Sequence, residues 1–368
     1  METCRSFRLA AAIAMLAFVA GCTTHGTRAS RKPAEVRAEI VRLLPPSTDD
    51  RGGWAADIAT AFGALDIEPD ASNICATLAV IGQESGYASD PAVPNLGRIA
   101  RGEIDRRAAE HGIPQLLVRA ALSLKSSDGR SYSVRIAAVR TERELSLVYE
   151  DLIGKVPMGR RLFAGSNPVH TGGPMQVAIA FAEREARDAD YPYPVEGSIR
   201  HEVFTRRGGV YFGIAHLLGY PAAYDRMIYR FADYNAGLYA SRNAAFQNAV
   251  AIASGTKLAL DGDLVSYDSR EPGATERAVR SIARALGLGD GEIRDALRKG
   301  ERSDFDKTPL YARVFERAER IARKRLPRAT IPNIALKSPK IRRQLTTEWF
   351  ANRVDQRYRA CLAKASGR

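Results

Sequence analysis

Hydrophobic residues recur at helical spacing along most of the chain after residue 50. Trp54, Ile58, Phe62 and Leu65 repeat every three or four positions, which is typical of an amphipathic helix. The same spacing predicts further helices over residues 73–84, 115–124, 142–153, 175–187, 196–218, 222–232, 241–253, 275–286, 292–298, 309–324 and 341–362. Residues 132–141 instead suggest a strand. The pattern predicts a mostly α protein with little strand.

Capping residues sharpen several of these boundaries. Ser72 or Asn73 suits the N-cap of a helix that runs to Glu84 and stops at Gly86. The turn Gly172-Gly173-Pro174 leads into a helix that we expect to begin at Met175. The backbone N–H groups at such a helix start are free to bind ligand oxygens.

The N-terminus has the features of an export signal. Arg5 and Arg8 precede a short apolar run that ends at Ala20, too short for a stable transmembrane helix. Small residues followed by Cys22 resemble a bacterial lipobox, which implies that residues 1–21 are removed and that Cys22 carries the lipid anchor. An uncleaved anchor, or an ordinary secretory signal with an incidental cysteine, is the alternative. The polar residues 22–50 suggest a tether, with a short helix over residues 34–44.

Length and charge add a location and exclude one class of partner. The chain has 368 residues, of which 45% are hydrophobic, so it can bury a large core and could form two domains. Its net charge of +13 would suit nucleic acid, but no nucleic-acid motif is present and export removes the chain from that partner. In the periplasm the charge suits anionic lipid or cell-wall carboxylates, or it is simply a solvated surface. Thr23, rather than Asp, after the cysteine favours an outer-membrane lipoprotein that faces the periplasm, by resemblance to Gram-negative sorting.

Of the four cysteines, Cys4 leaves with the signal and Cys22 would carry lipid. Cys75 and Cys361 remain in an oxidising compartment, which favours a disulfide between them over two buried thiols. No group of residues has zinc-ligand spacing, so we expect neither a metal nor a cofactor.

Three short segments carry the candidate chemistry: Glu84-Ser85-Gly86-Tyr87, Gly173-Pro174-Met175-Gln176 and Asp233-Tyr234-Asn235-Ala236-Gly237. They supply a carboxyl group at the C-terminal end of an apolar helix, an amide, and a phenol. An apolar surround and the negative end of the helix dipole would raise the pKa of Glu84, as a general acid for glycoside cleavage requires. Each segment also has an ordinary structural interpretation: a surface glutamate at a fraying helix end, a core methionine at a loop–helix junction, and an Asn-Gly helix cap.

Together, the three segments resemble the E-S, G-L-M-Q and A-Y-N motifs of the lytic transglycosylases, a lysozyme-like family that cleaves peptidoglycan glycan strands. The resemblance implies that Glu84 is the single acid and base, and that the bond between MurNAc and GlcNAc is cut with formation of 1,6-anhydroMurNAc. It assigns substrate binding to Ser85, Met175, Gln176, Tyr234 and Asn235. Tyr234 would hydrogen-bond near the catalytic carboxyl, and Asn235 would position backbone or sugar.

The chain departs from that family in several places. Pro174 replaces a usual leucine and removes one N–H, and Asp233 stands where a small residue is usual. The stretch between Glu84 and Gln176 is much longer than in the family. We therefore expect a lysozyme-like helical core over residues 51–260, with residues 90–168 as a helical insertion subdomain and residues 261–368 as a helical C-terminal extension.

Three functions remain open from the sequence. The first is a lytic transglycosylase acting on peptidoglycan. The second is a lysozyme-like lipoprotein that has lost catalysis and serves as a peptidoglycan-binding or envelope scaffold, which the departures at Pro174 and Asp233 favour. The third is an envelope-assembly lipoprotein that uses its basic helices as a docking face.

Overall fold

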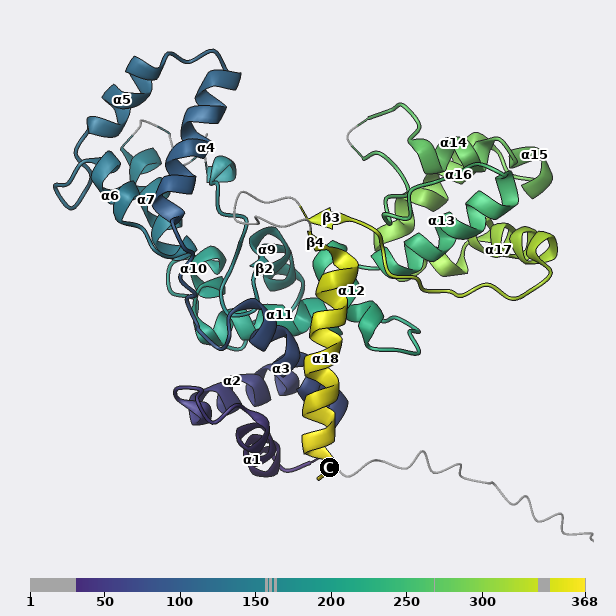
Figure 1. Cartoon of the computed structure of the whole chain (residues 1–368), viewed down its shortest axis with the longest axis horizontal. Coiled ribbons are helices and arrows are strands. Elements are labelled where there is room, and N and C mark those ends of the chain that lie inside the picture. Colours follow the sequence, from purple (N-terminus) through teal and green to yellow (C-terminus); the bar gives the residue numbers. More distant parts are fainter. Residues whose placement is uncertain are drawn as a thin grey trace, which may run out of the picture.

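The computed structural model describes residues 31–367 apart from 156–157, 159–160, 162–163, 268 and 337–344. The prediction of a mostly helical chain is confirmed. The described strands are two short antiparallel pairs: Thr171–Gly172 (β1) with Val177–Ala178 (β2), and Ala335–Leu336 (β3) with Leu345–Thr346 (β4). Figure 1 shows a central body with one helical lobe on each side.

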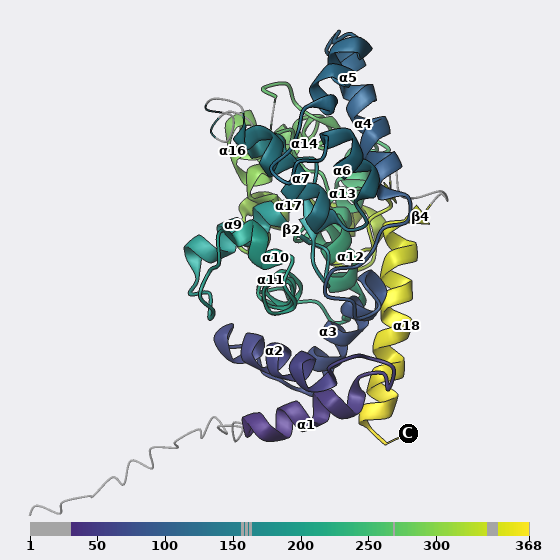
Figure 2. The same ribbon diagram turned by 90° about the vertical axis from the view of Figure 1, so that its left-hand side faces the viewer.

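The central body gathers helices from both ends of the chain. Its members are α1 (Pro33–Leu43), α2 (Arg51–Ala64), α3 (Ala71–Glu84), α9 (Ile179–Asp188), α10 (Ile199–Val203), α11 (Arg206–Leu218), α12 (Ile228–Ala236) and α18 (Thr347–Ala365). Every position of α3 from Ile74 to Gly82 is buried, which is typical of a helix enclosed on all sides. In Figures 1 and 2, α18 runs alongside α3, and the two helices pack extensively.

The first lobe is built by the segment that follows α3. It contains α4 (Leu96–Glu110), α5 (Gln115–Ser123), α6 (Tyr132–Ala138) and α7 (Glu142–Gly154). The expected strand over residues 132–141 is wrong. The two buried residues of α6, Tyr132 and Ile136, lie four positions apart, which is helical spacing, and Ser131 caps the helix by accepting from the Val134 N–H at 3.3 Å.

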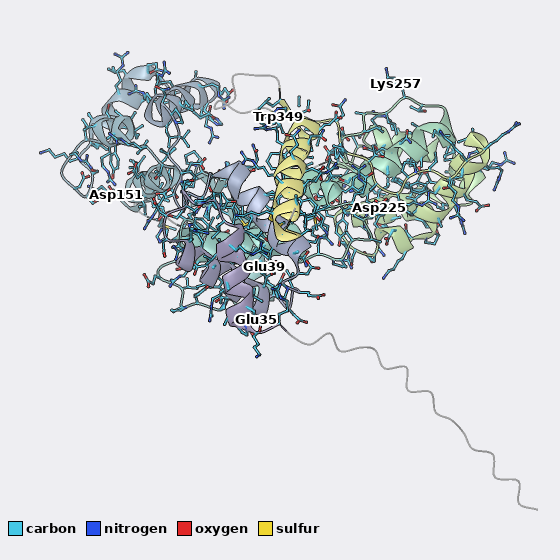
Figure 3. The ribbon with its side chains drawn as sticks, turned by 60° about the horizontal axis from the view of Figure 1, so that its bottom comes forward. Glu35, Glu39, Asp151, Asp225, Lys257 and Trp349 are labelled. Carbon is cyan, nitrogen blue, oxygen red and sulfur yellow. A yellow bond between two sulfur atoms is a disulfide. The ribbon has the colours of Figure 1, made fainter. Side chains whose placement is uncertain are left out.

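The second lobe has a separate hydrophobic core. It contains α13 (Ala240–Ser254), α14 (Ala274–Arg280), α15 (Ala283–Leu286), α16 (Asp290–Leu297) and α17 (Pro309–Ala322). Phe246 stacks on Tyr311 with ring centroids 5.7 Å apart, and Phe305 meets Phe246 edge-on at 5.0 Å. In Figure 3, Lys257 is labelled on this lobe and Asp151 on the first lobe, while Trp349 marks the start of α18 between them.

The structure moves two expected boundaries. Residues 22–50 were expected to form a tether with a short helix over residues 34–44. The helix is confirmed as α1, but its residues Val36, Ile40 and Leu43 are buried in the body. The extension was expected to begin at residue 261, yet α13 already contributes to the second core, and α18 returns to the first. The expected signal, residues 1–21, and Cys22 lie outside the described residues. Among the described helices, none combines the length and apolar character needed to cross a bilayer.

Candidate functional site

Glu84 is the last residue of α3. Asp70 begins the helix by accepting from the Asn73 N–H at 2.7 Å, so the N-cap is Asp70 rather than Ser72 or Asn73. After Glu84 the chain turns sharply, with positive φ at both Gly86 and Tyr87. Tyr87 folds back and donates its hydroxyl to the Leu78 carbonyl at 3.0 Å. These contacts fix the end of α3, and with it the Glu84 backbone.

The carboxyl group of Glu84 favours the protonated form. Burial and, as the smaller cause, the negative charge of Glu142 raise its pKa to about 8. The residue keeps some contact with solvent. Among the described residues, no hydrogen bond or ion pair to its carboxyl oxygens is found. Glu84 is therefore a protonated, unengaged acid at neutral pH.

Glu142 is the second acid of the site, and the sequence did not single it out. It is the first residue of α7 and is buried. The adjacent cap is built by Thr141 and Glu144, which exchange hydrogen bonds with each other's backbone N–H groups. Glu142 is thus not needed for this cap. No motif marked it, because its partner Glu84 lies on a distant helix.

The second segment is a β-hairpin turn and not a helix start. Residues 173–176 connect β1 and β2, and the following helix begins only at Ile179. Gly173 has φ +72°, and a Cβ there would lie 2.0 Å from the Val203 carbonyl oxygen, so only glycine fits. The expected helix start at Met175, with its free N–H groups, is therefore wrong.

The amide of Gln176 is used inside this hairpin. It donates to the Gly173 carbonyl at 3.2 Å, and its oxygen accepts from the Thr171 hydroxyl at 3.3 Å. Met175 is fully buried against Gly213, where an added Cβ would meet its sulfur at 2.3 Å. The Met175 side chain therefore belongs to the core, as the ordinary interpretation of this segment had it.

Tyr234 connects the second and third segments. It lies in α12, is buried, and donates its hydroxyl to the Met175 carbonyl at 2.7 Å. Burial and the negative charge of Glu84 raise its pKa well above the usual range. Its ring packs on His216 with centroids 4.9 Å apart. Tyr234 is thus close to Glu84, although its hydrogen bond goes to the hairpin.

His216 is a further feature that sequence reasoning missed. Its ring lies between Phe181 and Tyr234, and burial lowers its pKa to about 4. The Nδ1 atom is buried without a hydrogen-bond partner among the described residues. A neutral imidazole therefore packs directly against the ring of Tyr234.

Two other predicted binding residues have internal partners. The Ser85 hydroxyl donates to the Ile81 carbonyl at 3.1 Å, one turn back in α3. The Asn235 side-chain oxygen accepts from the Thr347 hydroxyl at 2.9 Å, which attaches α12 to the first turn of α18. The structure therefore brings Glu84, Met175 and Tyr234 together, while the polar atoms of Ser85, Gln176 and Asn235 hold the fold around them.

Asp233 is a buried acid that, unlike Glu84, has several hydrogen-bond donors. Its carboxylate accepts from the hydroxyls of Tyr220 at 3.0 Å and Tyr224 at 2.6 Å, and from the Ser241 N–H at 2.6 Å. Burial raises its pKa, against these hydrogen bonds, which lower it. Ser241 belongs to α13, and the two tyrosines lie in the segment between α11 and α12, so Asp233 links α12 both to the body and to the second lobe.

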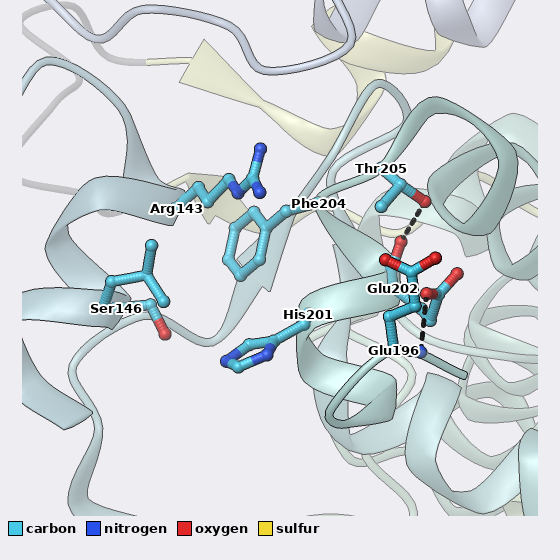
Figure 4. A pocket seen from close by; sticks show the side chains of 8 residues that line it. Arg143, Ser146, Glu196, His201, Glu202, Phe204 and Thr205 are labelled. Atoms are coloured by element: carbon cyan, nitrogen blue, oxygen red, sulfur yellow. Dashed lines mark hydrogen bonds between the residues drawn. The ribbon is translucent and has the colours of Figure 1, made fainter.

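A small pocket of about 140 Å³ lies where α7 meets α10 (Figure 4). His201 contacts the Glu150 carboxylate at 2.8 Å across this junction. Glu202 is buried, but hydrogen bonds from Arg207 and Tyr191 more than offset the effect of burial and lower its pKa. An ionised, fully engaged Glu202 is unsuited to act as an acid, and the pocket contains none of the predicted site residues.

A disulfide joins Cys75 and Cys361, with Cα atoms 5.5 Å apart. It ties α18 to the helix that carries Glu84. No group of three or more His, Cys, Asp or Glu side chains in the described part of the chain is arranged to hold a metal ion.

The comparison with known families gives a different result from the three motifs. A family model described as "Protein of unknown function (DUF1615)" matches residues 47–364. The chain belongs to this family. It is also 53% identical over 347 residues, which is 94% of this chain and 95% of the relative, to "Uncharacterized protein YaiW" of Escherichia coli (strain K12). No solved structure matches the chain.

The DUF1615 match spans all three segments that suggested the lytic transglycosylases. The expected membership of that family is therefore wrong. Short motifs of two to four residues recur by chance, whereas the family match extends over most of the chain. What remains for this DUF1615 protein is the geometry itself: an unengaged protonated acid beside a second carboxylate and a buried phenol.

Proposed function

We propose that this DUF1615 protein cleaves a glycosidic bond of peptidoglycan glycan strands, with Glu84 as the general acid. The proposal concerns the reaction, and not membership of the lytic transglycosylase family. The observation that carries it is the raised pKa of Glu84, about 8, together with the lack of a protein partner for its carboxyl oxygens among the described residues. An acid with this pKa is protonated at neutral pH and can give its proton to a leaving oxygen.

The proposed reaction needs one acid group. Glu84 protonates the oxygen between MurNAc and GlcNAc as the bond to the anomeric carbon breaks. The resulting carboxylate then takes the proton of the MurNAc 6-hydroxyl, whose oxygen closes on the anomeric carbon and gives a 1,6-anhydro end. No external water is consumed. The acid is regenerated in the second step.

The proposed fold of the body is lysozyme-like. A helix that ends in the acid, a short β-hairpin and a helix that carries the phenol support it, because Tyr234 interacts with both Glu84 and the hairpin. We also propose that Cys22 is lipidated and that the protein faces the periplasm from the outer membrane. The apolar run and the small residues before Cys22 support this location.

Glu142 supports a variant of the reaction. A second carboxylate near the acid is what glycosidases use to activate water or to form a covalent intermediate. In that case the product would carry a reducing MurNAc end. The end group of the released fragments therefore distinguishes the two routes.

A peptidoglycan-binding scaffold without catalysis is the second candidate. The observation that favours it is the internal engagement of Gln176 and Ser85, two polar groups that the motif resemblance had assigned to substrate. Under this alternative the protein would bind sacculi and release nothing. Glu84 would then be a buried acid without a reaction.

The test is digestion of purified sacculi, with the released fragments identified by mass spectrometry. We expect 1,6-anhydro fragments from the wild type and none from a folded Glu84→Gln variant. The matched control is Glu185→Gln, because burial and Asp188 also raise the pKa of Glu185, which lies on α9 outside the three segments. Equal release by wild type and Glu84→Gln, or no release by the wild type, would contradict the proposal.

A further inference from the structure

The first lobe contains a cavity of about 800 Å³, open to solvent, between α4, α5, α7 and residues 168–171. Its walls are largely aliphatic, and they include Leu96, Ile99, Ile104, Leu122, Leu145 and Val148. The volume lies within the range of natural small-molecule sites. The second lobe, by contrast, fills its centre with aromatic rings.

The cavity follows α4 and α7 along their length. The two helices start side by side, because the Val93 N–H donates to the Arg140 carbonyl at 2.8 Å just before them. Lining residues then recur on one face of each helix, from Leu96 through Ala108 on α4 to the capping residue His111, and from Glu142 to Leu152 on α7. The result is an elongated space suited to a chain-like occupant.

The apolar walls make both a water-filled cavity and an empty cavity unfavourable. Water inside would find few hydrogen-bond partners along the aliphatic walls, and a void of this size would forfeit the dispersion contacts of its lining. Filling the space with an apolar group recovers those contacts. The walls therefore favour a hydrocarbon occupant.

Charge at the far end of α4 indicates the polar part of that occupant. Arg107 and His111 line the cavity one turn apart, and both reach solvent. Arg107 pairs with Glu103 through its Nε atom at 2.7 Å, and within the described residues no hydrogen bond occupies its two terminal nitrogens. Glu103 also lines this end and offsets part of its charge, so the terminal nitrogens of Arg107 are the donors left for a headgroup. These donors and a hydrocarbon wall together match an amphiphile with an anionic headgroup.

The surface around the cavity is also apolar. Leu116 and Leu117 on α5 are 74% and 58% exposed, and the neighbouring Ile113 is 45% exposed. Ile113 and Leu117 also line the cavity, so the exposed patch is continuous with its walls. Such a patch suits contact with a lipid surface.

We propose that this cavity binds a single acyl chain of an anionic lipid, with the hydrocarbon along α4 and α7 and the headgroup at Arg107 and His111. The site is distinct from the proposed glycan cleavage and does not require the Glu84 carboxyl. Glu142 lines the inner end of the cavity and also influences Glu84, so the two sites are neighbours.

The test uses the chain from residue 22 with Cys22→Ser, which removes the proposed anchor, in the absence of detergent. Titration with palmitate and with palmitoyl lysophosphatidylglycerol, each below its micelle concentration, distinguishes a carboxylate from a phosphate headgroup. We expect saturable binding of at least one of them at one molecule per chain, with a negative heat-capacity change. Hexadecanol, which lacks the charge, should bind about tenfold more weakly, and Arg107→Gln should remove that difference.

Two variants on one helix locate the site. Ala108→Phe places a ring in the cavity and should weaken binding at least about tenfold. Ala109→Phe adds the same ring one position along α4, where the residue is exposed and outside the cavity lining, and should leave binding unchanged. Glu84→Gln should also bind normally.

A second measurement needs no variant. A photoreactive diazirine analogue of palmitate, bound to the otherwise unaltered chain and activated by light, should label peptides of α4, α5 or α7. No saturable binding of either lipid, labelling confined to other helices, or equal affinity in Ala108→Phe would each overturn the proposal.

Discussion

The surroundings of Glu84 and of Asp233 show two ways in which this protein buries an acid. Burial raises the pKa of both groups. Asp233 accepts three hydrogen bonds, from Tyr220, Tyr224 and Ser241. Glu84 accepts none from the described residues and lies near a second carboxylate instead. A buried acid with several donors stabilises a fold, whereas one without donors weakens it at high pH.

The largest expected effect is the loss of stability in an Asp233→Ala variant. Asp233→Ala would leave two phenol hydroxyls and one backbone N–H without their acceptor. At roughly 1–3 kcal/mol for each of these three groups, we expect a loss of about 3–9 kcal/mol in the free energy of unfolding. Urea denaturation measures this loss. A change of under 1 kcal/mol would show that Asp233 is not the link that its contacts indicate.

The next effect concerns the helix that carries Glu84. Replacing both cysteines of the Cys75–Cys361 disulfide by serine should lower the stability by about 2–4 kcal/mol, because the unfolded chain loses a long covalent loop. Thermal unfolding of the double variant and the wild type, with and without reductant, checks this. Reductant should affect only the wild type. A wild type that reductant leaves unchanged would contradict the prediction.

Glu84→Gln should stabilise the protein at high pH, opposite in sign to Asp233→Ala. The pKa of Glu84 is about 8 in the fold and near the ordinary 4.5 when unfolded. The folded wild type therefore binds the proton more tightly, and its stability falls as the pH rises between these two values. At pH 9 we expect the variant to be more stable than the wild type by roughly 2–4 kcal/mol, with little of this difference at pH 4. Denaturation at both pH values tests this, and equal differences at the two would contradict it.

Tyr234→Phe should have a smaller effect. The variant removes the hydroxyl that donates to the Met175 carbonyl and leaves that buried oxygen without this donor. We expect a loss of about 1–2 kcal/mol in stability. Tyr229→Phe, on the same helix, is the matched control, because the Tyr229 side chain is only partly buried. Equal losses in both variants would show that the hydroxyl bond to the hairpin contributes nothing specific.

Glu142→Gln should give the smallest effect, a change in pH dependence. Burial is the larger cause of the raised pKa of Glu84, and the charge of Glu142 is the smaller one. Removing that charge should lower the pKa of Glu84, so the loss of glycan cleavage at high pH should begin at a lower pH. A pH–rate profile of sacculus digestion measures this. An unchanged alkaline limb would show that the two carboxyl groups do not interact.

The sequence alone predicted much of the helical framework, because a strong period of three to four residues needs only local information. The α2, α5 and α7 helices begin and end close to the expected positions. The strand expected at Tyr132–Ala138 was an error because only two buried residues of this short helix show the helical spacing. The start of the second lobe was also missed, because the packing of α13 depends on contacts between segments far apart in the chain.

The candidate site was predictable only in part. Glu84 and Tyr234 came from short motifs, and the structure brings them together. Those same motifs indicated the wrong family, and they assigned Gln176 and Ser85 to a substrate when both have partners inside the fold. Glu142 and His216 could not be found, because no local pattern marks a residue whose importance comes from a neighbour on another helix.

The central claim is that Glu84 holds an available proton at neutral pH. The direct measurement is a titration of its side-chain carboxyl by carbon-13 NMR, assigned by comparison with Glu84→Gln. The account predicts a midpoint near pH 8, well above that of an exposed glutamate. A midpoint near 4.5 would contradict it, since the carboxyl would then be ionised at neutral pH and would have no proton to give.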